Sequence, residues 1–256
     1  MRPERRDSDE SIVAGRNPVI ELLKTEQPVD KILMQKGDRQ GGSLGKIAAM
    51  AEDRGIPVKD VAKEKLDMMC PGAAHQGVAA VVAAARYADL SEIEEKAAQK
   101  GEPLFVVICD GIEDPHNLGA IIRTADAAGA HGVIIPRRHG AGLTASAVKS
   151  SAGAASHVLV ARVANLASTV EELKKKNVWI YAADMGGENW CGIDYSGAVG
   201  VVVGSEGSGV SRLIKDKSDT IVGLPMYGEV NSLNASVAAA LVLYEVARQR
   251  HQIKAR

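Results

Sequence analysis

Three short segments place polar side chains beside glycine or proline, each just after an apolar run. They are residues 114–125 with Asn117 and Arg123, 201–209 with Glu206, and 222–236 with Ser232 and Asn234. Amide, carboxylate, hydroxyl and guanidinium groups of this kind can grip a ligand and stabilise charge that develops on a reacting atom. The three segments are therefore the candidate site.

The second segment follows an apolar run and leads into a helical pattern, as a phosphate-binding glycine loop does. Glu206 argues against phosphate, because a carboxylate repels a pyrophosphate but tolerates a cationic ligand such as a sulfonium. Neither the G-x-G-x-x-G spacing nor a Walker A sequence occurs. Taken alone, this segment is compatible with a simple turn.

The third segment contains Gly223 and Pro225, which fix a backbone course that exposes amides and carbonyls to a ligand such as an adenine edge. Asn231, Ser232 and Asn234 then fall around the start of the last predicted helix. Helix capping is the alternative to ligand binding here, and for Ser232 alone capping is favoured.

The first segment predicts a helix on which Asn117 and Thr124 share one face, with Arg123 between that face and solvent. An isolated arginine on a helix is usually a solvated charge or the partner of a carboxylate. Asp110 and Glu113 are the candidate partners.

Alternating strands and helices must position these segments. Continuous apolar runs predict strands at residues 104–109, 132–135, 178–181, 199–203 and 220–222. Helical patterns lie at residues 117–128, 144–152, 166–176, 210–217 and 232–249. This alternation predicts a doubly wound α/β domain with a parallel sheet, whose ligand loops lie at the carboxyl ends of the strands.

The first part of the chain predicts a separate small α/β unit. Apolar runs alternate with helical patterns up to residue 86, and residues 87–101 are rich in Glu, Lys and Gln. We therefore expect a domain over residues 11–86, a helical connector over 87–101, and a larger domain over 102–256.

Composition limits the classes of function. The chain has 256 residues, 46% hydrophobic content and a formal net charge of -1, so RNA binding cannot be inferred from overall charge. Residues 127–170 contain no Asp or Glu, and predict either a positive face or a buried segment that needs few charges. Its basic side chains are Arg137, Arg138, Lys149 and Arg162, with His131, His139 and His157 able to add charge.

Other features predict a soluble, cytoplasmic protein. Cys70, Cys109 and Cys191 have neither metal-ligand nor disulfide spacing, and no run is long enough to span a membrane. The first ten residues are charged, which predicts a frayed end rather than a signal peptide.

Together, in this order, the three segments resemble the SpoU/TrmH family of RNA ribose 2'-O-methyltransferases. The resemblance covers most of the chain, since residues 15–19 and 75–78 resemble the RNA-binding N-terminal domain of the rRNA-directed members. It implies a SPOUT-class α/β fold with a deep trefoil knot, S-adenosylmethionine as cofactor, no metal, and a homodimer whose active site is completed across the interface.

The resemblance also implies roles for individual residues. Gly204, Leu224 and Leu233 correspond to backbone contacts with the cofactor. The catalytic group corresponds to Asn117, Arg123, Glu206, Ser232 and Asn234. In the family the arginine is proposed to accept the hydroxyl proton. Because guanidinium stays protonated in proteins, we interpret Arg123 as a phosphate contact that stabilises developing negative charge.

The expected activity is methylation of a ribose 2'-hydroxyl of rRNA, with a guanosine of 23S rRNA as the target and neither DNA nor a membrane as a partner. Alternatives are a tRNA 2'-O-methyltransferase and a non-catalytic ribosome-assembly factor. A nucleotide-dependent α/β enzyme is disfavoured by the missing phosphate-loop spacing.

Overall fold

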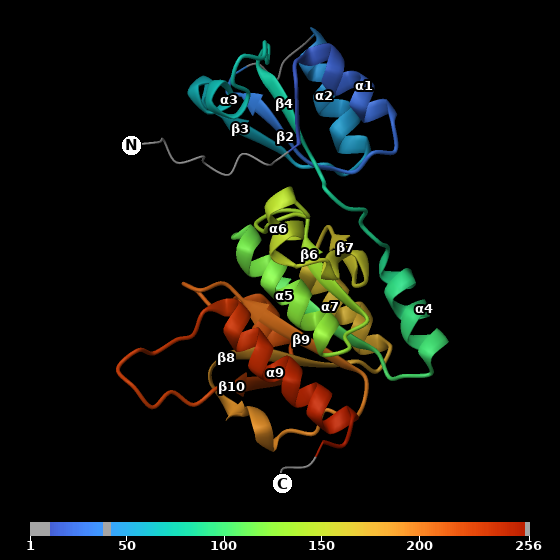
Figure 1. Ribbon diagram of the computed structural model, residues 1–256, viewed down its shortest axis with the longest axis vertical. Helices are drawn as coiled ribbons and strands as arrows, with labels where there is room; N and C mark the ends of the chain where they lie inside the picture. The colour runs from blue at the N-terminus through green and yellow to red at the C-terminus, as the bar shows by residue number, and fades with distance from the viewer. Residues whose placement is uncertain (1–10, 38–41, 254–256) are drawn as a thin grey trace. The chain divides into compact units, whose positions relative to one another are not determined.

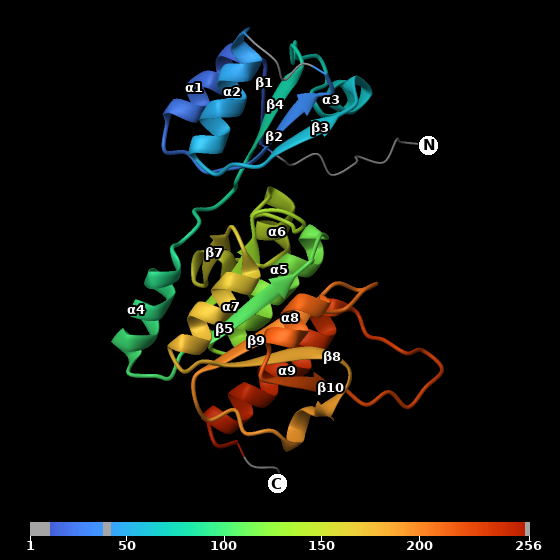
Figure 2. The ribbon, with the colours of Figure 1, turned by 180° about the vertical axis from the view of Figure 1, so that it is seen from behind.

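The computed structural model describes residues 11–37 and 42–253, so the expected fraying of the first ten residues lies outside the described part. The chain forms two compact units. The first contains the described residues up to Arg86 together with Gly142–Ser146, and the second contains Tyr87–Ala141 and the described residues from Ala147 onward (Figures 1 and 2).

The first unit has three layers, and the middle layer is a sheet with the strand order β1-β4-β2-β3. Its strands are β1 (Ile12–Ala14), β2 (Val29–Gln35), β3 (Val58–Val61) and β4 (Val78–Val82). Helices α1 (Arg16–Lys24) and α2 (Gly42–Asp53) cover one face. Helix α3 (Lys63–Met69) covers the other, where Leu66 packs against Leu33 and Val81.

The second unit contains a six-stranded sheet with the order β10-β8-β9-β5-β6-β7, and all of its strand pairs are parallel. Its strands are β5 (Phe105–Asp110), β6 (Gly132–Pro136), β7 (Leu159–Val163), β8 (Trp179–Asn189), β9 (Val199–Gly204) and β10 (Thr220–Gly223). The central strands β5 and β9 are apolar on both faces, which confirms the predicted parallel α/β sheet.

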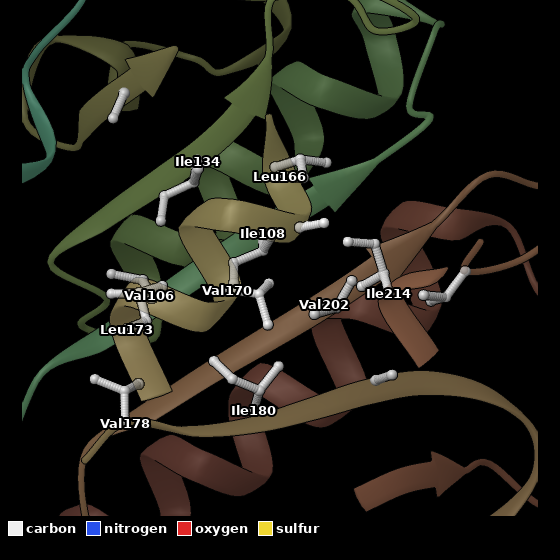
Figure 3. Close-up of a cluster of buried hydrophobic side chains, with 14 of the residues drawn as sticks. Val106, Ile108, Ile134, Leu166, Val170, Leu173, Val178, Ile180, Val202 and Ile214 are labelled. Carbon is white, nitrogen blue, oxygen red and sulfur yellow. The ribbon is translucent and has the colours of Figure 1, made fainter. Parts of the chain in front are cut away.

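Helices cover both faces of this sheet. Helices α5 (Pro115–Ala127) and α9 (Ala235–Arg250) pack against each other on one face (Figure 1). On the other face, α4 (Leu90–Lys100), α7 (Leu166–Lys175) and α8 (Arg212–Lys217) contribute to one core with Val106, Ile180 and Val202 (Figures 2 and 3). The remaining short helices are α6 (Ala145–Ser150), η1 (Ala154–Ser156) and η2 (Trp190–Gly192).

Helix α4 lies within the segment for which the sequence predicts a connector. Ile93 and Ala97, one helical turn apart, are both buried, and Ile93 belongs to the core of the second unit. A capping box formed by Asp89 and Glu92 begins the helix, and Gly101 ends it in the left-handed conformation. By its contacts, this helix is part of the second unit.

Two strands differ from the sequence-based prediction. Strand β7 was not predicted, because it is a short edge strand with Arg162 in an otherwise apolar run. Strand β8 continues well beyond residue 181, and its register with β10 shifts between Ile221 and Val222. Gly187 permits this bulge, since a Cβ there would lie 2.3 Å from the Ile221 carbonyl oxygen.

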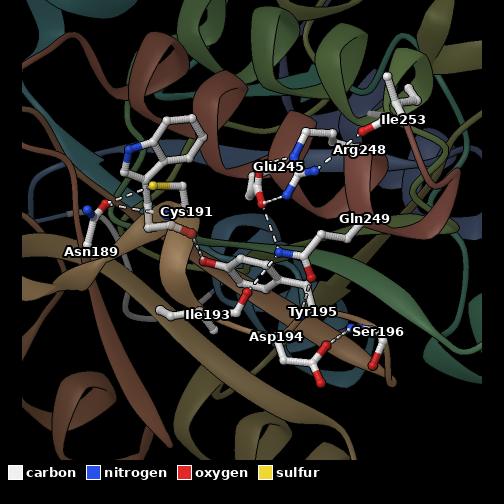
Figure 4. Close-up of polar contacts among 11 residues, drawn as sticks. Asn189, Cys191, Ile193, Asp194, Tyr195, Ser196, Glu245, Arg248, Gln249 and Ile253 are labelled. Carbon is white, nitrogen blue, oxygen red and sulfur yellow. Dashed lines mark hydrogen bonds and ion pairs between the residues drawn. The ribbon is translucent and has the colours of Figure 1, made fainter. Parts of the chain in front are cut away.

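A polar network joins the end of α9 to the segment that follows β8 (Figure 4). Gln249 Oε1 accepts from the Tyr195 amide at 2.8 Å, and Gln249 Nε2 donates to the Ile193 carbonyl oxygen at 2.8 Å. The buried Glu245 carboxylate accepts two hydrogen bonds of 2.7 Å from Arg248. The two Gln249 bonds fix the C-terminal end of the helix whose N-terminal end reaches the candidate site, and the Arg248 bonds supply partners for the buried carboxylate within the helix.

Helix α5 approaches the 147–151 segment closely. A Cβ at Gly119 would lie 2.4 Å from the Ala147 carbonyl oxygen and 2.5 Å from Ser150 Cβ. Asp114 caps the helix by accepting from the His116 amide at 2.9 Å, and Pro115 occupies its first turn. These features set where α5 begins, and with it the position of Asn117.

His131 predicts a specific loss of stability in acid. It is fully buried, its Nδ1 accepts from the Phe105 amide at 3.0 Å, and its Nε2 lies 3.0 Å from Glu102 Oε2, which fits a neutral ring protonated at Nε2. Burial lowers the pKa of His131 below its ordinary value of 6.5, and the Glu102 carboxylate opposes this only partly. The unfolded chain therefore binds a proton at higher pH than the folded chain, so stability falls as pH drops below about 6.5.

The measurement is urea unfolding of the wild type and His131→Asn between pH 8 and pH 5. The asparagine Oδ1 can accept from Phe105 but does not titrate. We expect the variant to be less stable at pH 8 and the difference to shrink toward pH 5. Parallel pH profiles of the two proteins would show that His131 does not contribute to the acid sensitivity.

Candidate active site

Three loops at the carboxyl ends of β5, β9 and β10 meet through one hydrogen-bonded triad, Asn117, Glu206 and Asn234. Asn117 Nδ2 donates to Glu206 Oε1 at 2.9 Å, and Asn234 Nδ2 donates to Asn117 Oδ1 at 3.0 Å. Asn234 Nδ2 also donates to Glu206 Oε1. The structure thus brings together one predicted residue from each of the three segments.

Helix capping fixes the orientation of the Asn234 amide. Asn234 caps α9, because its Oδ1 accepts from the Ser236 amide at 2.9 Å and the Ser236 hydroxyl at 2.6 Å. Its Nδ2 must therefore point the other way, toward Glu206. Both amides donate to Oε1 of Glu206, and within the described residues Oε2 has no hydrogen-bond partner. A carboxylate with one free oxygen results.

A cavity of about 320 Å³, called here the loop pocket, adjoins the triad. Glu206 and Asp184 line it, as do the four predicted residues Gly204, Leu224, Ser232 and Leu233. Apolar groups complete the wall, among them Val203, Val222 and Ala238. Lys215 also lines the pocket and pairs with Asp184, so Glu206 is the carboxylate that is left to face an organic cation beside the apolar wall.

The loop between β10 and α9 presents unused backbone groups to this pocket. Residues 224–233 make no hydrogen bond to any other part of the chain that the structure describes. Leu224 and Leu233 are only half buried, and both line the pocket. Free amides and carbonyls beside apolar side chains can bind the edge of an aromatic ring.

Ser232 does not cap the last helix, so the prediction favoured for it alone is wrong. Helix α9 begins at Ala235, and Asn234 supplies the cap. Ser232 and Asn231 precede the helix and line the loop pocket. The capping residue could not be chosen from the sequence because Asn231, Ser232 and Asn234 are all good capping types.

Asp184 belongs to the site but was not predicted from the sequence. Its Oδ2 accepts from the Val210 amide at 3.0 Å and lies 3.1 Å from Lys215 Nζ, and its side chain is 11% exposed. Gly209 has φ of +64°, and a Cβ there would lie 2.8 Å from the same oxygen. Asp184 therefore holds the Glu206 loop in place. An Asp just after the apolar run 178–183 was the available signal.

Gly204 has a packing role of its own. A Cβ at this position would lie 2.1 Å from the Gly209 carbonyl carbon. The turn is closed by paired backbone bonds between Ser205 and Gly209, of 3.1 Å and 3.0 Å. Glycine is required here whether or not a ligand contacts this backbone.

Arg123 is placed apart from the other predicted catalytic residues. It is exposed on α5, lines neither of the two pockets found at this edge of the sheet, and has no ion-pair partner within the described residues. The expected partner Asp110 instead accepts from the Ser211 amide at 2.7 Å. Six residues beyond Asn117, a side chain is turned by roughly 240° around the helix axis, which explains the separation.

The stretch without acidic residues does not present all of its predicted charges. His131 is fully buried, and Arg162 lies over the Tyr87 ring at 5.2 Å from its centroid. Arg138, Lys149, His139 and His157 are exposed. The stretch therefore contains both exposed basic side chains and buried residues, so the positive face and the buried segment are each found in part.

Other reactive groups take no part in this site. All three cysteines are free, and burial, followed by the Asp110 charge, raises the pKa of Cys109 to about 12. Within the described residues, no group of three or more His, Cys, Asp or Glu could hold a metal ion. No helix in the part of the chain that the structure describes is long and apolar enough to cross a membrane.

Comparison with known proteins identifies two family matches. Residues 104–244 match the SpoU rRNA Methylase family, and residues 12–88 match the family described as RNA 2'-O ribose methyltransferase substrate binding. YacO of Bacillus subtilis, assigned to the TrmH family of tRNA/rRNA methyltransferases, is 46% identical over 94% of this chain and 96% of its own. A relative from Staphylococcus aureus (strain COL), with the same assignment, is 44% identical over 96% of this chain and 98% of its own.

Solved structures agree with this assignment. The SpoU methyltransferase AviRb from Streptomyces viridochromogenes, in complex with the cofactor AdoMet, is 25% identical with a TM-score of 0.60 over 98% of this chain and 95% of its own. The A. aeolicus TrmH/SpoU tRNA modifying enzyme is 29% identical with a TM-score of 0.54 over 62% of this chain and 85% of its own. The chain belongs to the SpoU/TrmH family of tRNA/rRNA methyltransferases, whose cofactor is S-adenosylmethionine.

Proposed function

We propose that this protein transfers a methyl group from S-adenosylmethionine to a ribose 2'-hydroxyl of rRNA, at a guanosine of 23S rRNA. One observation carries the proposal: the Glu206 carboxylate, held by Asn117 and Asn234, keeps a free oxygen beside a pocket suited to an organic cation. The family membership supplies the reaction class, the match of the first unit to a substrate-binding family supports an RNA substrate, and the description of the matched SpoU family favours rRNA.

The loop pocket fits this cofactor by the chemistry of its lining. The unused backbone groups of Leu224 and Leu233 suit an adenine edge, and Val203 and Val222 supply apolar contact. Lys215 pairs with Asp184, whereas the hydrogen-bond partners of Glu206 are neutral amides, so Glu206 keeps its negative charge for a cationic centre. When bound, the cofactor supplies an activated methyl group.

The chain's own groups then act on the ribose. Glu206 Oε2 accepts a hydrogen bond from the 2'-hydroxyl, orients the oxygen for attack and takes up its proton as the new O–C bond forms. Arg123 remains protonated, contacts the RNA phosphate and stabilises negative charge that develops on that oxygen. Asn117 and Asn234 position the carboxylate, and Ser232 contacts ligand in the loop pocket.

We propose that the protein acts as a homodimer in which Arg123 reaches the site of the other subunit. Helix α9 exposes an apolar stripe of Val237, Leu241 and Tyr244, with exposures of 47%, 38% and 53%. The spacing places these side chains on one helix face. The neighbouring α5 carries Arg123, exposed and unpaired among the described residues. A second copy that covers this stripe brings its own active site toward Arg123, which lies apart from the active site of its own chain.

Two structural features belong to the same proposal. The domain over residues 11–86 binds the RNA, and the domain over 102–256 threads a deep trefoil knot through its C-terminal segment. The proposed knot involves the Glu206 loop and the 224–233 loop, whose residues line the same pocket. A tRNA substrate is the second candidate, because the relatives carry the joint tRNA/rRNA assignment.

The first test is transfer of labelled methyl from S-adenosylmethionine to unmodified 23S rRNA and to tRNA, mapped by resistance to alkaline cleavage. We expect one resistant linkage, in 23S rRNA and 3' of a guanosine. A resistant linkage in tRNA alone would favour the second candidate. Cofactor binding without transfer to either RNA would favour a ribosome-assembly role.

A second prediction separates the catalytic role of Asn234 from its role as a helix cap. Asn234→Ala removes both, whereas Asn165→Ala removes only a cap, the 3.1 Å bond from the Ser168 amide to Asn165 Oδ1 at the start of α7. We expect each variant to lose about 1 kcal/mol of stability. Only Asn234→Ala should lose methyl transfer, by about tenfold or more, because Glu206 loses a charge-assisted donor. Equal activity of the two variants would exclude a catalytic role for Asn234.

A third prediction concerns the dimer. Arg123→Ala and Asn234→Ala chains, each with about a tenth of wild-type activity or less alone, are unfolded together and refolded as a mixture. If Arg123 serves the partner's site, about half of the dimers are mixed and each has one intact site, giving about a quarter of wild-type activity. If Arg123 serves its own chain, mixing restores nothing. Arg123→Lys, assayed at saturating RNA, should lose most of its rate, since ammonium lacks the guanidinium fork.

A further inference from the structure

A second cavity, of about 420 Å³ and called here the side pocket, lies next to the loop pocket. The two pockets share Ser205, Glu206, Ser208 and Ala235 in their walls. The other walls of the side pocket are Gly111, Ile112, Glu113, Asp114, Asn117 and His139. The proposed function assigns an occupant to the loop pocket and a role to Glu206, but it leaves the side pocket without a ligand.

The side pocket is rich in hydrogen-bond acceptors. Glu113, Asp114 and Glu206 all contribute carboxylates, and none of them forms an ion pair within the described residues. Asp114 Oδ1 accepts from the His116 amide, and Glu206 Oε1 accepts from two side-chain amides. Glu113 is exposed and has no hydrogen-bond partner among the described residues. Such a lining repels phosphate and favours a ligand that presents N–H donors.

The wall that carries Glu113 is held in place by the backbone. Gly111 adopts φ of +73° directly after β5, and the Ile112 carbonyl oxygen accepts from the Ala141 amide at 2.7 Å. That bond ties the Glu113 turn to the loop that contains His139. Glu113 and the imidazole ring of His139 therefore belong to two segments that are joined beside the pocket.

The proposed reaction restricts what can enter. A ribose at Glu206 lies at the wall that the two pockets share, with the loop pocket on one side and the side pocket on the other. The group attached to that ribose is the base. Guanine alone among the four RNA bases presents two adjacent donors, N1–H and the 2-amino group, on its Watson–Crick edge. One carboxylate can accept from both.

We propose that the side pocket receives the base of the target nucleotide and that Glu113 selects guanine by accepting from N1–H and the 2-amino group. His139 is the one ring among the lining residues and supplies a flat surface for the base. This inference rests on the proposed methyl transfer, because the position of the ribose comes from it. Glu113 is a specificity residue and takes no part in the transfer itself.

The test measures binding of free guanosine, inosine and adenosine to the full chain saturated with S-adenosylmethionine, by saturation-transfer NMR titration. Guanosine should bind about tenfold tighter than adenosine, with inosine between them, because inosine lacks the 2-amino donor. Glu113→Gln should weaken guanosine binding by about tenfold and leave adenosine unchanged. Glu113→Asp, which keeps the charge on a shorter side chain, should give an intermediate loss.

The matched control is Glu95→Gln, which removes an exposed carboxylate from α4. It should bind all three nucleosides as the wild type does. Equal affinity for guanosine and adenosine, or equal behaviour of Glu113→Gln and Glu95→Gln, would overturn the inference. So would a Mg²⁺ titration of the nucleoside-free protein in which Glu113→Gln alone loses binding, because the carboxylate would then serve a cation.

Failure of this inference is distinct from failure of the proposed function. Selective guanosine binding that depends on Glu113, without methyl transfer to RNA, would support the guanine preference of the side pocket and refute the activity. Methyl transfer whose target nucleotide is not guanosine, by mass spectrometry of the digested RNA, would leave the activity intact and refute the role of Glu113.

Discussion

The arrangement of the site depends on how one carboxylate is held without a cation. Glu206 receives its hydrogen bonds from the side-chain amides of Asn117 and Asn234, and neither neutralises its charge. Each amide is in turn fixed by a helix start, since Asn117 lies in the first turn of α5 and Asn234 caps α9. The triad therefore ties the charge of one loop to the starting points of two helices. An error of one residue in either helix start would remove a donor and leave the carboxylate under-bonded.

Close backbone approaches make that arrangement possible. Gly119 lets α5 pack against the 147–151 segment, Gly204 and Gly209 close the Glu206 turn, and Gly187 lets β8 bulge beside β10. Asp184 then holds the end of the Glu206 turn by accepting from the Val210 amide and pairing with Lys215. At the far end of α9, Gln249 bonds the Tyr195 amide and the Ile193 carbonyl oxygen, which holds the helix against the segment that follows β8 (Figure 4). The position of Asn234 is thus set from both ends of one helix.

A feature could be predicted from the sequence where neighbouring residues decide it, and could not where contacts between distant segments decide it. Continuous apolar runs at 104–109 and 199–203 predict buried parallel strands because local hydrophobicity alone requires burial on both faces. Strand β7 was not predicted because it contains Arg162. This side chain is accommodated at the edge of the sheet by Tyr87, which is distant in the sequence. The choice of Asn234 as the cap, the role of Asp184 and the separation of Arg123 from the triad all depend on contacts between distant segments. Residue types alone do not decide these contacts.

An acidic site is an unusual place for a polyanion such as RNA to bind. The distribution of charge over the surface explains how RNA can bind there. Carboxylates line both pockets, while Arg123, Arg138 and Lys149 are exposed outside them. Phosphates are repelled from the interior and attracted by these outer cations, so that only uncharged parts of a nucleotide can enter. For the proposed reaction, the ribose and the base are the parts that must enter. In the proposed reaction, the same carboxylates that favour a cationic cofactor therefore also exclude the RNA backbone from the pockets and admit only its uncharged groups.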